Sequence, residues 1–220
     1  MLNEYEKYVE DFKPQYVIGI DEVGWGAVAG PLVLGCAVYP ASFKHDRVKD
    51  SKSFTTERSR QNAERIVLDT AAYWYLHFTD STTIAKVGAA TAIKTALFKV
   101  AEKASEKYPD ALLVIDGTRI IPGIRNEQLA LHKADALVPA VSAASILAKV
   151  ARDRHMSLLH TTCPEFEWDS NKGYPTQKHI KLLQTYGVSE HHRLNIDLVR
   201  DALIRRGQYK KQEMEIIREA

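Results

Sequence analysis

The segment from Pro31 to Pro40 is an almost unbroken apolar run, and it limits the possible folds more than any other feature of the sequence. A strand with apolar residues on both faces must be covered on both faces, as in sheets flanked by helices. Further strands are expected at Tyr16–Asp21, Ala72–Phe78 and Ala111–Asp116, which are rich in apolar or aromatic residues. The chain therefore has the pattern of an α/β protein.

Helical periodicity separates and follows these strands. Helices are expected over residues 55–71, over Ile84–Tyr108, over Val138–His160 with Pro139 in the first turn, over Pro175–Tyr186, and from Leu194 to the C-terminus. The pattern predicts an α/β fold with a sheet of about five strands in the first half of the chain, flanked by helices, and a largely helical C-terminal third.

Composition excludes several classes of protein. The formal charge of +2, from 30 basic and 28 acidic side chains, is too small for binding nucleic acid by bulk electrostatics, although a local basic face remains possible. The polar N-terminus has no signal or transit pattern, and no apolar stretch is long enough to span a membrane. The two cysteines, Cys36 and Cys163, form no close pair, which favours a reducing compartment. We expect one main domain in a cytoplasmic protein.

Aspartate ends two of the expected strands. YVIGID ends at Asp21, with Glu22 beside it, and LLVID ends at Asp116. The carboxyl ends of strands in α/β sheets open into the crevice where ligands bind, so these acids are candidates for catalysis. The alternative is that each acid marks a strand's exit into solvent. Asp21 and Glu22 can share a site only if the chain turns there, and the following VGWG is expected to supply that turn.

A third acid, Asp135, precedes a helix rich in small residues. Ser142, Ser145, Lys149 and Arg152 follow at spacings that align them on one helical face. This face is either the polar stripe of an amphipathic helix or a surface that holds phosphates next to the acids.

Converging carboxylates repel one another and raise at least one pKa unless a cation compensates. Oxygen ligands without histidine or cysteine favour Mg²⁺ or Mn²⁺ over zinc. Two such ions about 3.5–4 Å apart can activate a water molecule and stabilise the leaving oxygen in phosphoryl transfer.

Six blocks, in order, resemble the ribonuclease HII family, a type 2 ribonuclease H. They are GIDEVGWGAVAGP, DSK at Asp50–Lys52, LLVIDG, KADALVPAVSAASILAKVARDRHM, NKGYPTQKH and GVSEHHR. The resemblance implies a ribonuclease-H-like fold with a mixed five-stranded sheet. It implies a single domain over residues 1–220, with a catalytic core over about 16–160 and a helical substrate-groove portion over about 161–220. It also implies that Asp21, Glu22, Asp116 and Asp135 are the catalytic, metal-binding acids.

The resemblance further implies a substrate. The family cuts the RNA strand of RNA–DNA hybrids and cuts 5′ to single ribonucleotides in duplex DNA, leaving 3′-hydroxyl and 5′-phosphate ends, which requires reading a 2′-hydroxyl. A Gly-Arg-Gly turn and a tyrosine do this in the family, and Tyr174 matches that tyrosine. Here the turn is Gly24-Trp25-Gly26, so the family's arginine is replaced by tryptophan. We expect hydrolysis to survive, with a changed affinity or preference for a single embedded ribonucleotide.

Other residues match family positions near the substrate backbone. They are Lys52, Ser142, Ser145, Lys149 and, on weaker grounds, Lys172. For the serines, a helix-packing role is the alternative, and His191 and His192 fit an anchoring role better than a chemical one. The alternatives for the whole chain are a ribonuclease H that requires longer hybrid tracts and a non-catalytic hybrid-binding protein. A monomer is expected.

Overall fold

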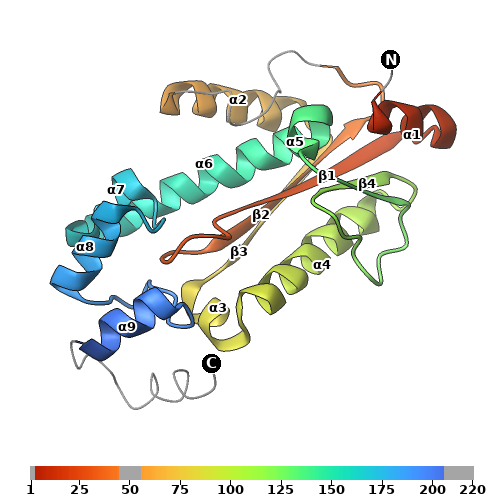
Figure 1. Cartoon of the computed structure of the whole chain (residues 1–220). Coiled ribbons are helices and arrows are strands. Elements are labelled where there is room, and N and C mark those ends of the chain that lie inside the picture. Colours follow the sequence, from red (N-terminus) through yellow and green to blue (C-terminus); the bar gives the residue numbers. More distant parts are fainter. Residues whose placement is uncertain (1–2, 45–55, 206–220) are drawn as a thin grey trace. The chain divides into compact units, whose positions relative to one another are not determined.

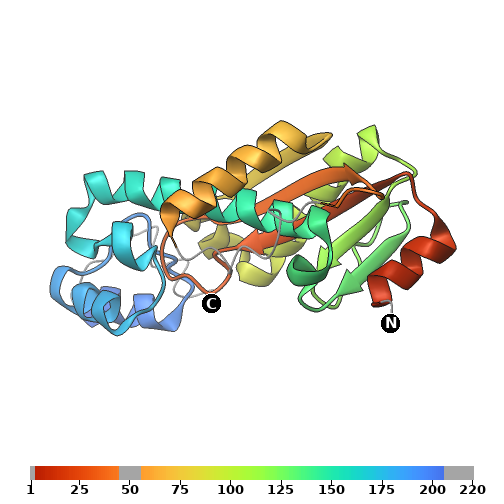
Figure 2. The ribbon, with the colours of Figure 1, turned by 90° about the horizontal axis from the view of Figure 1, so that it is seen from above.

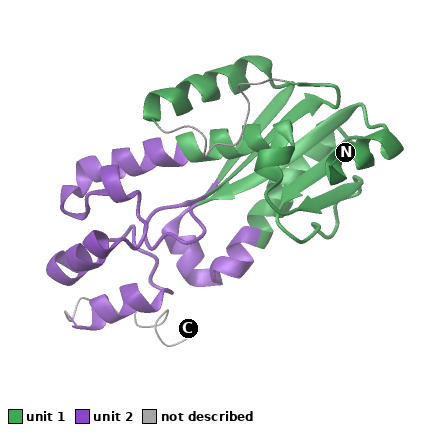
Figure 3. Ribbon diagram, turned by 45° about the horizontal axis from the view of Figure 1, so that its top comes forward, with its two compact units in different colours: residues 1–23, 33–77, 94–150 green, residues 24–32, 78–93, 151–220 purple. Residues whose placement is uncertain are grey.

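The computed structural model describes residues 3–44 and 56–205. The chain divides into two compact units (Figure 3). Unit 1 comprises residues 1–23, 33–77 and 94–150, and unit 2 comprises residues 24–32, 78–93 and 151–220. No helix in the described part of the chain is long and apolar enough to cross a membrane.

Unit 1 is built on a five-stranded mixed sheet with the order β3-β2-β1-β4-β5. The strands are β1 (Tyr16–Val23), β2 (Leu32–Pro40), β3 (Tyr73–Thr79), β4 (Leu112–Asp116) and β5 (Gln128–Leu131). β1 runs antiparallel to β2 and parallel to β4, and β4 runs parallel to β5. The expected mixed sheet is confirmed. The segment of β5, with only four residues, was too short to be recognised from its pattern.

Helix α6 (Pro139–Thr162) packs against the centre of this sheet through its first part, residues 139–150. A Cβ on Gly19 of β1 would lie 2.1 Å from the backbone carbon of Ala140, and one on Gly35 of β2 would lie 2.5 Å from the carbonyl oxygen of Ala144. Only glycine permits so close an approach of helix to strand. Pro139 begins the helix, as predicted.

The two faces of the sheet have separate partners within unit 1. Val17, Leu112 and Val114 share a buried cluster with residues of α6 and of α2 (Glu57–Thr70), which Thr56 caps. Figure 1 places α4 (Ala89–Lys107) on the face opposite α6, and Figure 2 shows α2 and α6 from above. The sheet is therefore covered on both faces, as the apolar run in β2 requires.

The helices of the structure differ from the predicted ones in two places. The single helix expected over Ile84–Tyr108 is wrong, because Gly88 separates α3 (Ser81–Val87) from α4. Gly88 has a φ of +77°, which ends a helix at little cost only in glycine. The N-terminal segment also contains a helix that was not expected, α1 (Glu4–Phe12), which Asn3 and Glu6 cap reciprocally.

Unit 2 is mainly helical. It contains α3, residues 151–162 of α6, and the elements η2 (Pro164–Phe166), α7 (Trp168–Asn171), α8 (Gln177–Tyr186) and α9 (Asp197–Arg205). Two small cores hold it together, one around Leu183 and Val199 and one around Met156, Phe166 and Trp168. Of the helix expected from Leu194 onward, the structure describes α9, and the remainder lies outside the described residues.

Candidate functional site

Asp21 and Asp116 lie at equivalent positions of adjacent strands in unit 1. Ile20 of β1 is registered with Ile115 of the parallel strand β4, so the next residues along both strands are these two aspartates. Asp116 is the last residue of β4, as predicted. The two carboxyl groups therefore come from the same end of the two parallel strands.

The strand that was expected to end at Asp21 continues to Val23, so the turn expected from VGWG comes after Asp21 and Glu22 and does not include them. β1 continues its antiparallel pairing with β2 through Asp21–Gly35, Glu22–Leu34 and Val23–Val33. The turn begins only at Gly24, whose φ is +89°. Asp21 and Glu22 nevertheless stay linked, because the backbone N–H of Glu22 donates to Oδ1 of Asp21 at 2.7 Å.

Two carboxyl groups in unit 1, those of Asp21 and Glu22, have raised pKa values. Burial raises the pKa of Asp21 to about 7; the charges of Glu22 and Asp116 also raise it, while a hydrogen bond from Ser145 lowers it. Burial and the charge of Asp116 raise the pKa of Glu22 as well. Only 7% of Asp21 is exposed, so solvent does little to screen the repulsion.

Asp135 belongs to the short helix α5 (Ala134–Leu137) and is buried. The neighbouring backbone N–H of Ala134 donates to Oδ1 of Asp116 at 2.8 Å. This bond attaches the start of α5 to the end of β4. Asp135 is therefore the next residue after a direct hydrogen-bond partner of Asp116.

These acids suit a hard divalent cation in their donor chemistry. The available ligands are carboxylate oxygens, and a cation offsets both the burial of their charge and the repulsion between them, which together raise the pKa of Asp21. Within residues 3–44 and 56–205, no group of three or more histidine, cysteine, aspartate or glutamate side chains is arranged to hold a metal ion as it stands. The fit therefore rests on charge and donor type.

The polar stripe expected along α6 is not a single exposed face. Ser142 is buried and its hydroxyl has no hydrogen-bond partner, Ser145 is buried and bonds to Asp21, and Lys149 is half-buried. Arg152, in unit 2, is wrong as a phosphate contact because its side chain is 0% exposed. Helical periodicity placed these residues on one side of α6 but did not reveal what covers them.

The Gly24-Trp25-Gly26 turn lies in unit 2. Trp25 is 47% exposed, and a Cβ on Gly26 would meet no atom within 4 Å, so this part of the turn is open. A Cβ on Gly24 would instead lie 2.3 Å from Nε of Arg152. Gly24 is therefore required both by its positive φ and by its packing.

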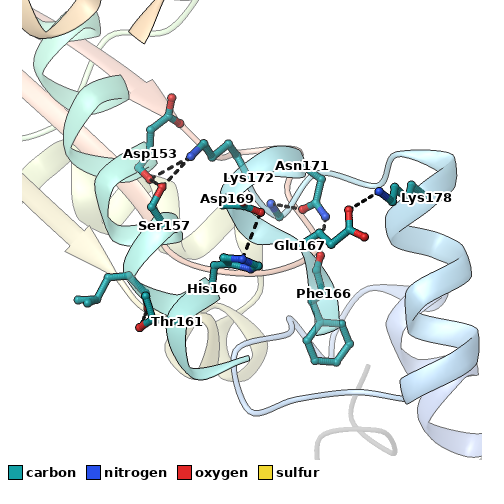
Figure 4. A network of polar contacts seen from close by, with 12 residues as sticks. Asp153, Ser157, His160, Thr161, Phe166, Glu167, Asp169, Asn171, Lys172 and Lys178 are labelled. Atoms are coloured by element: carbon teal, nitrogen blue, oxygen red, sulfur yellow. Dashed lines mark hydrogen bonds and ion pairs between the residues drawn. The ribbon is translucent and has the colours of Figure 1, made fainter. Parts of the chain in front are cut away.

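Lys172 and Tyr174 also lie in unit 2. The ammonium group of Lys172 donates to Oγ of Ser157 at 2.8 Å and to the carbonyl oxygen of Asp153 at 3.4 Å (Figure 4). The half-buried ring of Tyr174 faces the guanidinium of Arg152, and its carbonyl oxygen lies 2.9 Å from Nδ1 of His179. Lys52 lies outside the described residues.

Sequence reasoning did not show how residues support this part of unit 2. Arg152, Arg193 and His179 are buried and bond to the segments that carry the turn and Tyr174, and the buried His192 bonds to His179. Arg193 and His192 stand in the GVSEHHR block. That block was a signal for an anchoring role, but the chain alone did not show what they anchor.

Comparison with known proteins decides the family. The model of the family described as ribonuclease HII matches residues 18–200. The chain belongs to the ribonuclease HII family. The protein is accordingly a metal-dependent endoribonuclease that cleaves the RNA of RNA–DNA hybrids.

A curated relative is similar in sequence over most of its length. Ribonuclease HII of Oceanobacillus iheyensis is 36% identical over 192 residues, which cover 87% of this chain and 72% of that protein. The similarity includes both units of the chain, since the family match begins in β1 and ends in α9.

Solved structures confirm the ribonuclease-H-like fold. The ribonuclease H2 of Pyrococcus horikoshii OT3 has a TM-score of 0.67 and 26% identity, covering 88% of this chain and 100% of that one. Bst-RNase HIII in complex with Mn²⁺ has a TM-score of 0.68 and covers 94% of this chain and 75% of that one. Its identity is 17%, so this likeness supports the fold alone.

Proposed function

We propose that this ribonuclease HII also cuts duplex DNA 5′ to single embedded ribonucleotides and leaves 3′-hydroxyl and 5′-phosphate ends. Asp21, Glu22, Asp116 and Asp135 form the catalytic site. The observation that carries the catalytic site is the convergence of Asp21 and Asp116 on the adjacent strands β1 and β4, where burial and mutual repulsion raise the pKa of Asp21 to about 7. The preference for a single ribonucleotide is proposed from the Gly24-Trp25-Gly26 turn and Tyr174.

Mg²⁺ or Mn²⁺ is the proposed cofactor, held by the carboxylates of these four acids. Its charge offsets their repulsion, and it supplies Lewis-acid catalysis of phosphodiester hydrolysis when bound. Ser145 and the backbone N–H of Glu22 orient Asp21, while the N–H of Ala134 orients Asp116. Bst-RNase HIII, which shares the fold, has been solved in complex with Mn²⁺.

The turn and Tyr174 are the proposed reading elements for the ribonucleotide. The open backbone around Gly26 lets a sugar approach closely, and the ring of Tyr174 stacks on the sugar of the deoxynucleotide that follows. Lys149 is the proposed backbone-phosphate contact in unit 1. Lys172 makes such a contact only if its ammonium leaves Ser157. Lys52, which lies outside the described residues, is also proposed as a backbone-phosphate contact, on the basis of the sequence alone.

The enzyme is proposed to act as a monomer in the cytoplasm on RNA–DNA hybrids and on ribonucleotide-containing DNA. Cys36 and Cys163 are both free, which agrees with a reducing compartment.

The test is cleavage of a labelled duplex with one ribonucleotide, beside an RNA–DNA hybrid, with Mg²⁺, Mn²⁺ or EDTA. We expect metal-dependent cutting immediately 5′ to the ribonucleotide. Cutting of the hybrid alone would show an enzyme that requires longer tracts, in which Trp25 has replaced the junction-reading residue. Failure to cut either substrate would leave hybrid binding without catalysis.

Asp21→Asn tests the catalytic site. Asp110→Asn, at an exposed acid of unit 1, is its matched control. Only the first substitution should abolish cleavage. Calorimetric titration with Mn²⁺ gives a readout that does not depend on activity, and Asp21→Asn should weaken binding there too.

A further inference from the structure

Two buried arginines of unit 2 bind the backbone that follows Trp25. Arg152 donates from Nε to the carbonyl oxygen of Pro31 at 2.8 Å and from Nη2 to that of Ala29 at 3.1 Å. Arg193 donates from Nε to the carbonyl oxygen of Gly30 at 3.0 Å and from Nη1 to that of Trp25 at 3.1 Å. The segment from Trp25 to Pro31 is therefore attached to two guanidinium groups.

Arg152 also reaches the segment that carries Tyr174. Its Nη1 donates to the carbonyl oxygen of Lys172 at 2.8 Å, and its Cζ lies 5.2 Å from the centroid of the Tyr174 ring. A second link runs through Gly173, whose carbonyl oxygen accepts from the backbone N–H groups of Val28 and Ala29. One side chain thus joins the segment after the turn to the proposed sugar-stacking residue.

The chemistry of arginine suits this task. A guanidinium presents donors in a rigid plane and stacks on aromatic rings, whereas a lysine ammonium offers a compact charge with no fixed plane. Arg152 uses three nitrogens on three separate carbonyl oxygens and its flat face on Tyr174. Burial lowers the pKa of Arg152, as expected for a cation removed from water. Burying this charge lowers the stability of the fold. Its benefit is the fixed geometry of the segments that it binds.

We propose that Arg152 is a positioning residue that sets the place of Tyr174 relative to the segment after the Gly24-Trp25-Gly26 turn, and through it the selectivity for a single embedded ribonucleotide. Its side chain is fully buried, so its effect on the substrate passes through the residues that it holds. The inference rests on the proposed recognition role of Tyr174.

The test compares kcat and KM on the single-ribonucleotide duplex and on the RNA–DNA hybrid. The readout is the ratio of kcat/KM for the two substrates, because partial unfolding lowers both values equally and leaves the ratio unchanged. We expect Arg152→Lys to lower this ratio about 10- to 100-fold, the loss typical of a reacting geometry displaced by about 1 Å. Arg152→Gln, which keeps planar amide donors, is the second variant if the lysine form does not fold.

Arg154→Lys is the matched control, because Arg154 is an exposed arginine of the same helix, α6. It should leave the ratio unchanged. Tyr174→Ala and the double variant complete a thermodynamic cycle, in which residues that act through one another are non-additive.

Support requires that Tyr174→Ala lowers the ratio and that adding Arg152→Lys lowers it no further. If Tyr174→Ala lowers the ratio while both Arg152 variants leave it intact, the positioning role is wrong and the proposed function stands. Fully additive losses would also overturn the inference, because Arg152 would then act by another route. An unchanged ratio in Tyr174→Ala would refute both the recognition role of Tyr174 and the inference built on it.

Discussion

Nε2 of His192 lies 3.2 Å from Nε2 of His179 in the buried interior of unit 2. The other partners fix which nitrogens carry protons. The N–H of Ser189 donates to Nδ1 of His192, and the indole N–H of Trp168 donates to Nε2 of His179. His192 therefore donates from Nε2, and His179 donates from Nδ1 to the carbonyl oxygen of Tyr174. Both rings must be neutral.

This pair predicts a loss of stability in acid. Burial, with smaller contributions from His179 and His191, lowers the pKa of His192 from 6.5 to about 3. The unfolded chain therefore binds more protons between these values, so the contribution is complete above pH 6.5 and is lost as pH falls toward 3. Thermal unfolding at pH 7.5, 6.5, 5.5 and 4.5 should show a weaker pH dependence in His192→Gln than in the wild type.

His132→Gln, at an exposed histidine, is the control and should keep the wild-type dependence. At pH 7.5 His192→Gln should be less stable than the wild type by about 1–3 kcal/mol, because buried hydrogen bonds lose their partner. Equal pH dependence in His192→Gln and the wild type would contradict the prediction.

Asp21→Asn should separate catalysis from stability. The cleavage rate and the affinity for Mn²⁺ should fall about 100-fold or more, since mutation of residues that only hydrogen-bond to metal ligands already lowers affinity or activity about 10–100-fold. Without metal, the variant should melt at a higher temperature, because a neutral amide avoids the cost of burying a charge and ends the repulsion with Glu22 and Asp116. Each kcal/mol gained would raise the melting temperature by about 2–4 °C. A metal-free variant that melts below the wild type would refute the electrostatic account.

Gly35→Ala should destabilise unit 1 by about 1–3 kcal/mol, the usual cost of overpacking. Its Cβ would lie 2.5 Å from the carbonyl oxygen of Ala144 and force α6 away from β2. Because Gly35 pairs with Asp21, the rates of cleavage of the single-ribonucleotide duplex and of the hybrid should fall by the same factor. Denaturant unfolding measures the stability. Gly26→Ala is the control, and its stability should match the wild type because its Cβ meets nothing.

Trp25→Arg, which restores the residue usual in the family, should change the relative rates on the single-ribonucleotide duplex and the hybrid. An arginine there offers charge-assisted bonds to phosphate that tryptophan cannot make. The 47% exposure of Trp25 means that folding should be unaffected. Trp74→Arg makes the same exchange at an exposed position of β3 and should not alter the rates. Identical rates in Trp25→Arg and the wild type would refute a role for this position.

Local patterns in the chain were enough for much of the fold. The apolar run of β2, the end of β4 at Asp116, the Thr56-capped helix α2 and the start of α6 at Pro139 all follow from residues a few positions apart. Such signals encode backbone conformation directly. The break at Gly88 carried the same kind of signal, but the helical periodicity on both sides of it concealed the boundary.

The sequence by itself determined which residue types stand at the strand ends and which family the ordered blocks resemble. Only the tertiary structure decided what those residues touch. The hydrogen bond from Arg152 to Ala29 joins residues 123 positions apart, and Ser145 reaches Asp21 only because Gly19 and Gly35 let α6 approach the sheet. A buried polar group takes its role from partners that folding brings to it, so no local pattern could separate the buried Arg152 from a phosphate-binding arginine.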